Sequence, residues 1–188
     1  MNETISDPQI IPYDTTPGSP YYQQFENVYL KDLELTQLEK EAAIWWGDDP
    51  DVSFTPPGHS YYFATLALEG HDSTLIECAQ VYAQVGMAVA DAFINCWKWK
   101  YQFFTERPNT FIPKYIDEEW ESFWPDPPFP SFPSGHAIQA AAAATVLEQV
   151  ESETNLKKQI LLLDHLILSG KLPKKLQILD FMVVFTQS

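Results

Sequence analysis

The sequence contains very little arginine and cysteine. Arg107 is the only arginine among 188 residues, and an excess of acidic side chains gives a formal net charge of −15. We therefore expect neither nucleic acid nor an anionic membrane surface as a partner. Cys78 and Cys96 lack a metal-type spacing, which favours buried thiols over a disulfide bridge. His59 has no neighbours in the sequence that complete a metal set, so we expect it to support a turn or another site residue, and we predict no metal site.

Long hydrophobic runs are also missing. No apolar stretch reaches the roughly 18 residues that are needed to cross a bilayer. Residues 1–7 lack the basic start and the apolar run of a signal peptide, so we expect a cytoplasmic protein with no membrane span. Strands with clean alternation, internal repeats and heptad runs are absent as well. The apolar content of 45%, with many aromatic rings, favours a packed domain over a disordered chain.

The composition divides the chain into three parts. Residues 1–35 are polar and carry prolines at short intervals, so we expect an extended N-terminal arm. Residues 36–156 contain clear helical patterns and form the expected helical domain. Residues 157–188 lose alanine, glutamate and tryptophan and gain lysine and leucine. We interpret this atypical tail either as a genuine amphipathic helix or as the product of a shifted reading frame.

Three segments of the middle part have the features of helices. A capping box that begins at Thr36 predicts a helix over residues 36–46. Residues 61–69 form an apolar segment suited to another helix, and a second capping box at Thr74 opens a long helix that we expect to reach about residue 104. Apolar and small residues at steps of three and four predict its core-facing stripe: Ile76, Ala79, Ala83, Gly86, Met87, Ala90, Phe93, Ile94 and Trp97.

The turn Pro133-Ser134-Gly135-His136 directly precedes an alanine-rich segment of high helix propensity at residues 137–150. The free N–H groups and the positive dipole end of that helix suit a phosphate-like oxyanion. Gly135 lets the main chain approach an anion, Ser134 offers a hydroxyl group, and His136 can carry a proton near neutral pH. In a simpler interpretation, Ser134 only caps the helix and His136 has no role.

Two cations lie among aromatic residues upstream of this turn. Lys100 and Arg107 are seven positions apart, so both can lie on one helix face or converge where the helix ends. Pro108 disfavours helix at Arg107 and places it at a helix exit or in an extended linker. A guanidinium fork matches tetrahedral oxyanions, and a lysine adds a point charge. Alternatively, Lys100 only extends to solvent and Arg107 pairs with a carboxylate.

Together, the two stretches carry the pattern Lys-x6-Arg-Pro followed by Pro-Ser-Gly-His. This pattern resembles that of the vanadium-dependent haloperoxidase and type-2 phosphatidic acid phosphatase superfamily. Additional stretches at residues 55–59, 90–97 and 128–130 resemble the soluble bacterial haloperoxidase-like branch, so the resemblance covers residues 36–152. It implies an all-α fold in which a helical bundle surrounds an oxyanion. This oxyanion is the cofactor vanadate or, when no cofactor is bound, the phosphate group of a substrate.

The resemblance also implies roles for individual residues. Lys100 and Arg107 would bind the equatorial oxygens of the oxyanion, and Ser134 with the main-chain N–H of Gly135 would complete the binding site. His136 would be the catalytic acid–base residue. The partners of such a site are a small oxyanion or a phosphoester, with halide and peroxide in the haloperoxidases. The resemblance gives no indication of the oligomeric state.

Both branches of the superfamily need a third motif, Ser-Arg-x5-His, whose histidine receives the phosphoryl group or anchors vanadium. No arginine follows Arg107, and the only later histidine, His165, lacks the serine and arginine before it. A shifted reading of residues 178–185 permits Ser-Arg-x5-His with suitable codons, which a nucleotide sequence would test. We therefore expect a C-terminally incomplete family member that is inactive as written. The competing interpretation is a non-catalytic helical module for anion binding or protein interaction.

Overall fold

The computed structural model describes residues 8–154 except for residues 50, 55–57 and 70–72. Within this part of the chain, all regular secondary structure is helical, which confirms the expected all-α fold class. The proposed tail at residues 157–188, including His165, lies outside the described residues. The helices are α1 Pro20–Leu33, α2 Gln37–Trp46, α3 Gly58–Leu68, α4 Leu75–Phe103, α5 Pro108–Tyr115 and α6 Gly135–Thr154.

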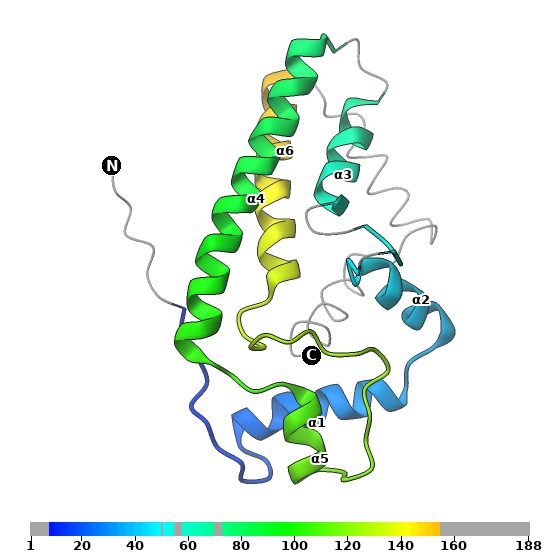
Figure 1. Ribbon diagram of the computed structural model, residues 1–188, viewed down its shortest axis with the longest axis vertical. Coiled ribbons are helices and arrows are strands. Elements are labelled where there is room, and N and C mark those ends of the chain that lie inside the picture. The colour runs from blue at the N-terminus through cyan, green and yellow to red at the C-terminus, as the bar shows by residue number, and fades with distance from the viewer. Residues whose placement is uncertain (1–7, 50, 55–57, 70–72, 155–188) are drawn as a thin grey trace.

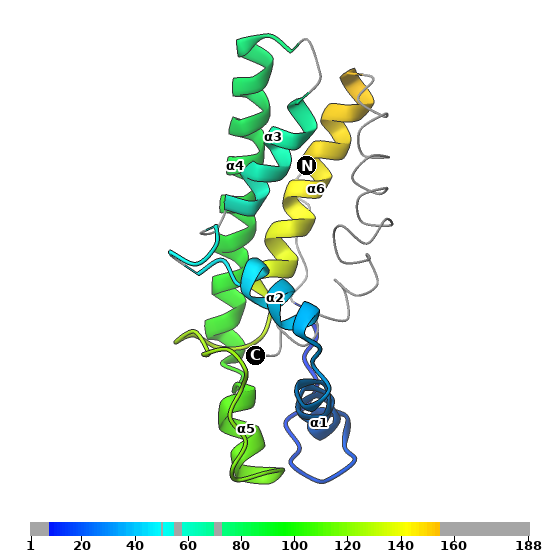
Figure 2. The ribbon, with the colours of Figure 1, turned by 90° about the vertical axis from the view of Figure 1, so that its right-hand side faces the viewer.

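Helices α4 and α6 form the long axis of the molecule. They run antiparallel and side by side, and α3 packs against both (Figures 1 and 2). The capping boxes at Thr36 and Thr74 are both formed, so α2 and α4 begin where the sequence predicts. Small and β-branched side chains let the three helices approach closely. The buried cluster between them consists of Ala64, Ala67, Val81, Val85, Val89, Ala143 and Leu147.

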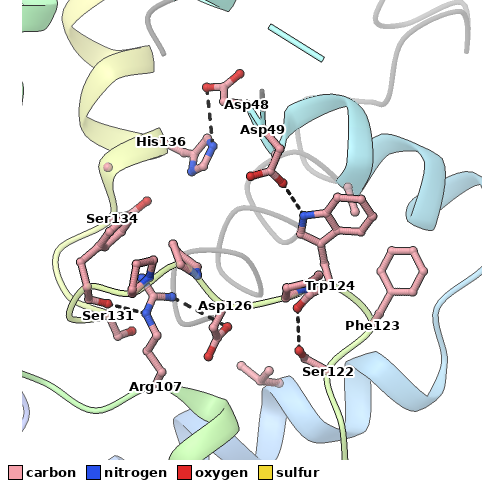
Figure 3. Close-up of a pocket in the computed structure, with 18 of the residues that line it drawn as sticks. Asp48, Asp49, Arg107, Ser122, Phe123, Trp124, Asp126, Ser131, Ser134 and His136 are labelled. Carbon is pink, nitrogen blue, oxygen red and sulfur yellow. Dashed lines mark hydrogen bonds and ion pairs between the residues drawn. The ribbon is translucent and has the colours of Figure 1, made fainter. Parts of the chain in front are cut away.

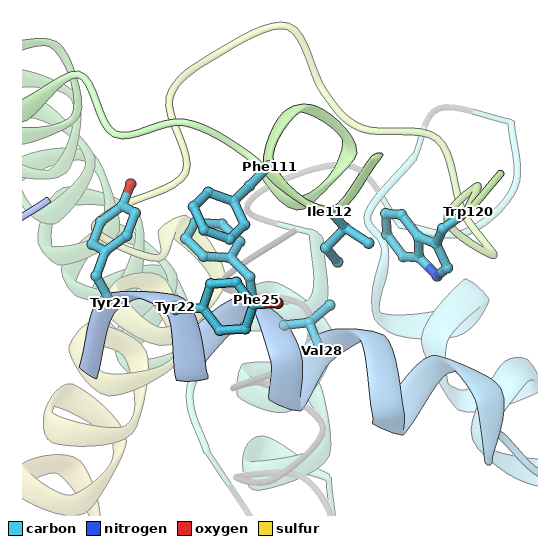
Figure 4. Close-up of a cluster of buried hydrophobic side chains, with 7 residues drawn as sticks. All are labelled: Tyr21, Tyr22, Phe25, Val28, Phe111, Ile112 and Trp120. Atoms are coloured by element: carbon cyan, nitrogen blue, oxygen red, sulfur yellow. The ribbon is translucent and has the colours of Figure 1, made fainter. Parts of the chain in front are cut away.

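Helices α1 and α5 enclose a second, aromatic core (Figure 4). Phe25 stacks on Phe111 with ring centroids 4.0 Å apart. The expectation of an extended arm over residues 1–35 is therefore wrong for residues 20–33. Ser19 caps α1 and Pro20 stands in its first turn, where a missing N–H costs nothing, so the prolines precede or begin this helix and do not interrupt it. The buried members of this core are Tyr21, Tyr22, Phe25, Val28, Phe111, Ile112 and Trp120.

The buried face of α4 differs from the predicted stripe. Val81, Val85 and Val89 are buried, whereas Ile76 is 79% exposed and Ile94 is 68% exposed. Both faces of this helix carry apolar residues at helical spacing, so periodicity does not tell which of them packs inward. The positions of α3 and α6 decide the outcome. The predicted stripe is wrong for most of its members, because six of them are exposed: Ile76, Ala79, Ala83, Met87, Ala90 and Ile94.

Candidate functional site

A cavity of about 600 Å³ opens between the end of α2, the end of α4, the loop at residues 122–131 and the start of α6 (Figure 3). All of the site residues predicted from the sequence line this cavity, although they come from three separate places in the chain. Aromatic rings from α4 and from the loop form much of the remaining wall. The predicted residues at the cavity are Lys100, Arg107, Ser134, Gly135 and His136.

Lys100 lies in the last turn of α4 and is only 1% exposed. Its Nζ donates hydrogen bonds to the main-chain oxygens of Pro130 at 2.8 Å and Ser131 at 2.7 Å. Nζ also lies 5.1 Å from the ring centre of Phe129. Burial is the main cause that lowers the pKa of Lys100 to about 8, and nearby Arg107 adds to this effect. Lys100 is therefore a buried ammonium group that titrates just above neutral pH.

Arg107 has extended main-chain geometry and is the residue immediately before α5. Its Nε donates to the main-chain oxygen of Phe129 at 2.5 Å, and its guanidinium carbon lies 5.0 Å from the ring centre of that residue. Nη1 is 3.9 Å from Oδ1 of Asp126, too far for a hydrogen bond. Nη1 is buried and has no hydrogen-bond partner. The sequence predicted a helix exit or an extended linker at this residue, and the extended main chain agrees with the second alternative, although α5 directly after it was not predicted.

Ser134, Gly135 and His136 form the start of α6. Ser134 Oγ accepts a hydrogen bond from the main-chain N–H of Ala137 at 3.1 Å, so this side chain does cap the helix. A methyl group on Gly135 would come no closer than 3.5 Å to the rings of Phe93 and Trp97. Burial is the main cause that lowers the pKa of His136. The turn thus combines a helix cap with a half-buried histidine at the cavity wall.

The sequence did not identify Asp48 as a site residue. Asp48 ends the turn after α2 and is 3% exposed. Its Oδ1 contacts Nδ1 of His59, and its Oδ2 accepts a hydrogen bond from Nε2 of Gln139 at 2.7 Å. The same Oδ2 lies 3.6 Å from Nε2 of His136 (Figure 3). No sequence signal links these residues, because 91 positions separate Asp48 from Gln139.

His59 has the supporting position that its sequence context predicted. It is 2% exposed, and its ring lies 4.1 Å from that of Trp45 and 4.9 Å from that of Trp46. Together with its contact to Asp48, these rings fix the imidazole in place. Among the described residues, no group of His, Cys, Asp and Glu side chains is arranged to hold a metal ion.

An oxyanion such as vanadate fits one side of this cavity. A buried guanidinium N–H without a partner is costly, and an anionic oxygen would satisfy it. Lys100 uses two of its three N–H donors on carbonyls and keeps one. The N-terminus of α6 adds its positive dipole end. Asp48 and Asp49 also line the cavity, whereas Asp126 lies 3.9 Å from Nη1 of Arg107 and therefore competes with an anion for this cation.

Comparisons with known proteins identify relatives of similar sequence and fold. A family model described as the VCPO second helical-bundle domain matches residues 80–182, more than half of the chain. A crystal structure titled as the first bacterial vanadium-dependent iodoperoxidase superimposes with a TM-score of 0.69 and 32% identity. The alignment covers 74% of this chain and 36% of that one, so the chain spans about a third of the length of that protein.

Two negative findings accompany these matches. A search of curated protein sequences finds no match to this chain. Each helix in the described part of the chain is too short or too polar to cross a membrane. The matching family model and the structural similarity at 32% identity nevertheless agree with each other. The chain belongs to the vanadium haloperoxidase-like superfamily.

Proposed function

We propose that this chain binds a tetrahedral oxyanion, vanadate or phosphate, in the cavity between α4 and α6. The observation that carries the proposal is that Arg107 lines the cavity and that its buried Nη1 has no hydrogen-bond partner. Lys100 supplies a second buried cation on the same wall. Ser134 and the main chain of Gly135 supply neutral donors, and His136 supplies a group that can carry a proton.

Vanadate is the ligand that the similarity favours, because the solved relative is titled as a vanadium-dependent iodoperoxidase. Bound vanadate would supply the chemistry that activates peroxide for halide oxidation. The residues of this chain would bind and orient it. Lys100 and Arg107 balance its negative charge in a partly dry site, where fixed donors are more effective than in water. His136 exchanges protons at the cavity wall.

We further propose that the 188-residue chain has no peroxidase or phosphomonoester hydrolase turnover. The third motif of the superfamily is absent from the sequence, since no arginine follows Arg107. That motif supplies a cation and the histidine that anchors vanadium or receives a phosphoryl group. Residues of such a site act as a unit, so the loss of these two removes nearly all activity. In this respect the chain resembles a non-catalytic anion-binding module.

Titration of the purified chain with vanadate, followed by vanadium NMR, tests the first proposal. We expect saturable binding that phosphate displaces, because both ions present the same tetrahedral oxygens. Absence of binding would overturn the proposal. Oxidation of iodide and bromide by peroxide, and hydrolysis of an aryl phosphate, test the second. We expect no turnover above that of the His136→Ala variant, and a clear rate with vanadate bound would show that the chain is an active enzyme.

A further inference from the structure

Asp48 connects two histidines that the sequence places far apart. It lies at the end of α2, its Oδ1 contacts Nδ1 of His59, and its Oδ2 lies 3.6 Å from Nε2 of His136. Gln139 donates to the same Oδ2 at 2.7 Å. The carboxylate is 3% exposed, so water does not compete freely for these contacts. Asp48 is therefore fixed by two neighbours, and its remaining contact is with His136.

The first turn of α6 brings His136 to this carboxylate. His136 and Gln139 are three positions apart on the helix, which puts both side chains on one face. Nε2 of His136 is buried and has no hydrogen-bond partner. A proton on Nε2 would point toward Oδ2 of Asp48, and a shift of a few tenths of an ångström would complete a hydrogen bond. Figure 3 shows the other ring nitrogen of His136 on the edge of the ring away from Asp48.

Several charged groups surround His136. Asp48 and His59 face it from the region of α2 and α3, and the main-chain carbonyls of residues 46 and 47 lie beside them. Burial lowers the pKa of His136, whereas the negative charge of Asp48, and to a smaller extent hydrogen bonding to the main chain of residues 46 and 47, act in the opposite direction. Without Asp48, burial would leave the imidazole neutral over more of the pH range. The other walls of the same cavity carry Lys100, Arg107, Asp49 and Asp126.

We propose that Asp48 is a positioning residue that orients the ring of His136 and holds a proton on its Nε2. His59 and Gln139 fix Asp48 in turn. This arrangement leaves Nδ1 of His136 to give or take a proton at the cavity, in the way that a buried carboxylate orients a catalytic imidazole through its opposite nitrogen. The inference rests on the proposed function only in assigning His136 to proton transfer. The orientation itself does not depend on a bound anion.

Heteronuclear NMR of the histidine-labelled full chain, without vanadate or phosphate, tests the inference. The His136 signals are assigned by comparison with His136→Gln. In the unaltered protein we expect neutral His136 as the Nε2–H tautomer. In Asp48→Asn we expect the pKa of His136 to fall by about one unit, because an opposite charge at this distance is removed. Asp49→Asn is the matched control, since Asp49 instead accepts a hydrogen bond from Trp124 Nε1 at 2.5 Å, and we expect a far smaller shift.

Two results would overturn the inference. The first is a neutral His136 in the Nδ1–H tautomer in the unaltered protein, a measurement that needs no variant to fold. The second is an unchanged His136 pKa in Asp48→Asn with a native near-ultraviolet circular dichroism spectrum. Vanadate titration of the same samples separates this inference from the proposed function. Loss of anion binding with the expected tautomer would contradict only the proposed function, and binding with the wrong tautomer would contradict only the role of Asp48.

Discussion

The two sides of the cavity hold their charged groups in different ways. On one side, Lys100 and Arg107 donate to main-chain carbonyls of residues 129–131. On the other side, Asp48 accepts from Gln139 and faces His136. Carbonyls carry no net charge, so they do not neutralise the two cations, and the Asp126 carboxylate 3.9 Å from Nη1 of Arg107 does so only in part. The first side is therefore suited to bind an oxyanion, whereas the second is suited to orient a histidine.

Removal of the arginine should disrupt the cation side most. In Arg107→Ala the buried guanidinium N–H groups are lost, and charge-assisted hydrogen bonds of this kind are worth about 1.5–3 kcal/mol each. We expect the Kd for vanadate to rise about 100-fold, measured by vanadium NMR or calorimetry. Lys98→Ala is the matched control, because it removes one positive charge from an exposed position on α4. An equal loss in both variants would mean that overall charge, and not the guanidinium group, binds the anion.

The pH dependence of anion binding should reveal the lysine on the same side. The pKa of Lys100 is lowered to about 8, so its positive charge is lost as the pH rises through this value. We expect the affinity for molybdate, whose own charge is constant in this range, to fall about tenfold from about pH 7 to about pH 9. Calorimetry at both pH values measures this change. Lys100→Gln should bind weakly at both, and a similar decline in that variant would assign the titration to another group.

The same lysine should make the free energy of unfolding rise with pH, whereas the affinity for the anion falls. The ordinary pKa of a lysine is 10.5, and that of Lys100 in the folded chain is lowered to about 8, so between these pH values the unfolded state binds more protons. The contribution of Lys100 to the free energy of unfolding therefore increases by about 1 kcal/mol per pH unit as the pH rises above about 8. Urea unfolding of the unaltered chain and of Lys100→Gln at two pH values isolates this effect. A difference between the two proteins that does not change with pH would contradict it.

The sequence predicted the cation side of the cavity better than the other side. Lys100, Arg107 and the turn at residues 133–136 lie within short motifs whose local structure follows from proline, glycine and helix-capping rules. Those rules placed Arg107 at a helix exit or in an extended linker, and the structure has it in extended chain directly before α5. The functional roles of these residues stay predictions. Asp48 belongs to no motif, and it reaches His136 only because the tertiary fold brings the turn after α2 to the start of α6, so no local signal could have identified it.

The fold shows the same limit of local reasoning. Capping boxes at Thr36 and Thr74 located the starts of two helices, because these hydrogen bonds form between residues close in the sequence. The prolines before residue 35 suggested an extended arm, yet α1 places Pro20 in its first turn, as α5 does with Pro108. Aromatic packing between these helices stabilises them, and such contacts depend on the tertiary structure.

A substitution at Gly135 should weaken anion binding without lowering the free energy of unfolding. Gly135 opens α6 with an ordinary helical main chain, and a methyl group there would make only normal van der Waals contacts with Phe93 and Trp97. We expect Gly135→Ala to leave the free energy of unfolding unchanged or to raise it by about 0.5 kcal/mol, since alanine restricts the unfolded chain. The methyl group would still project at the cavity wall, so we expect the Kd for vanadate to rise a few-fold. Unchanged binding would show that the anion does not approach the main chain of α6 at Gly135.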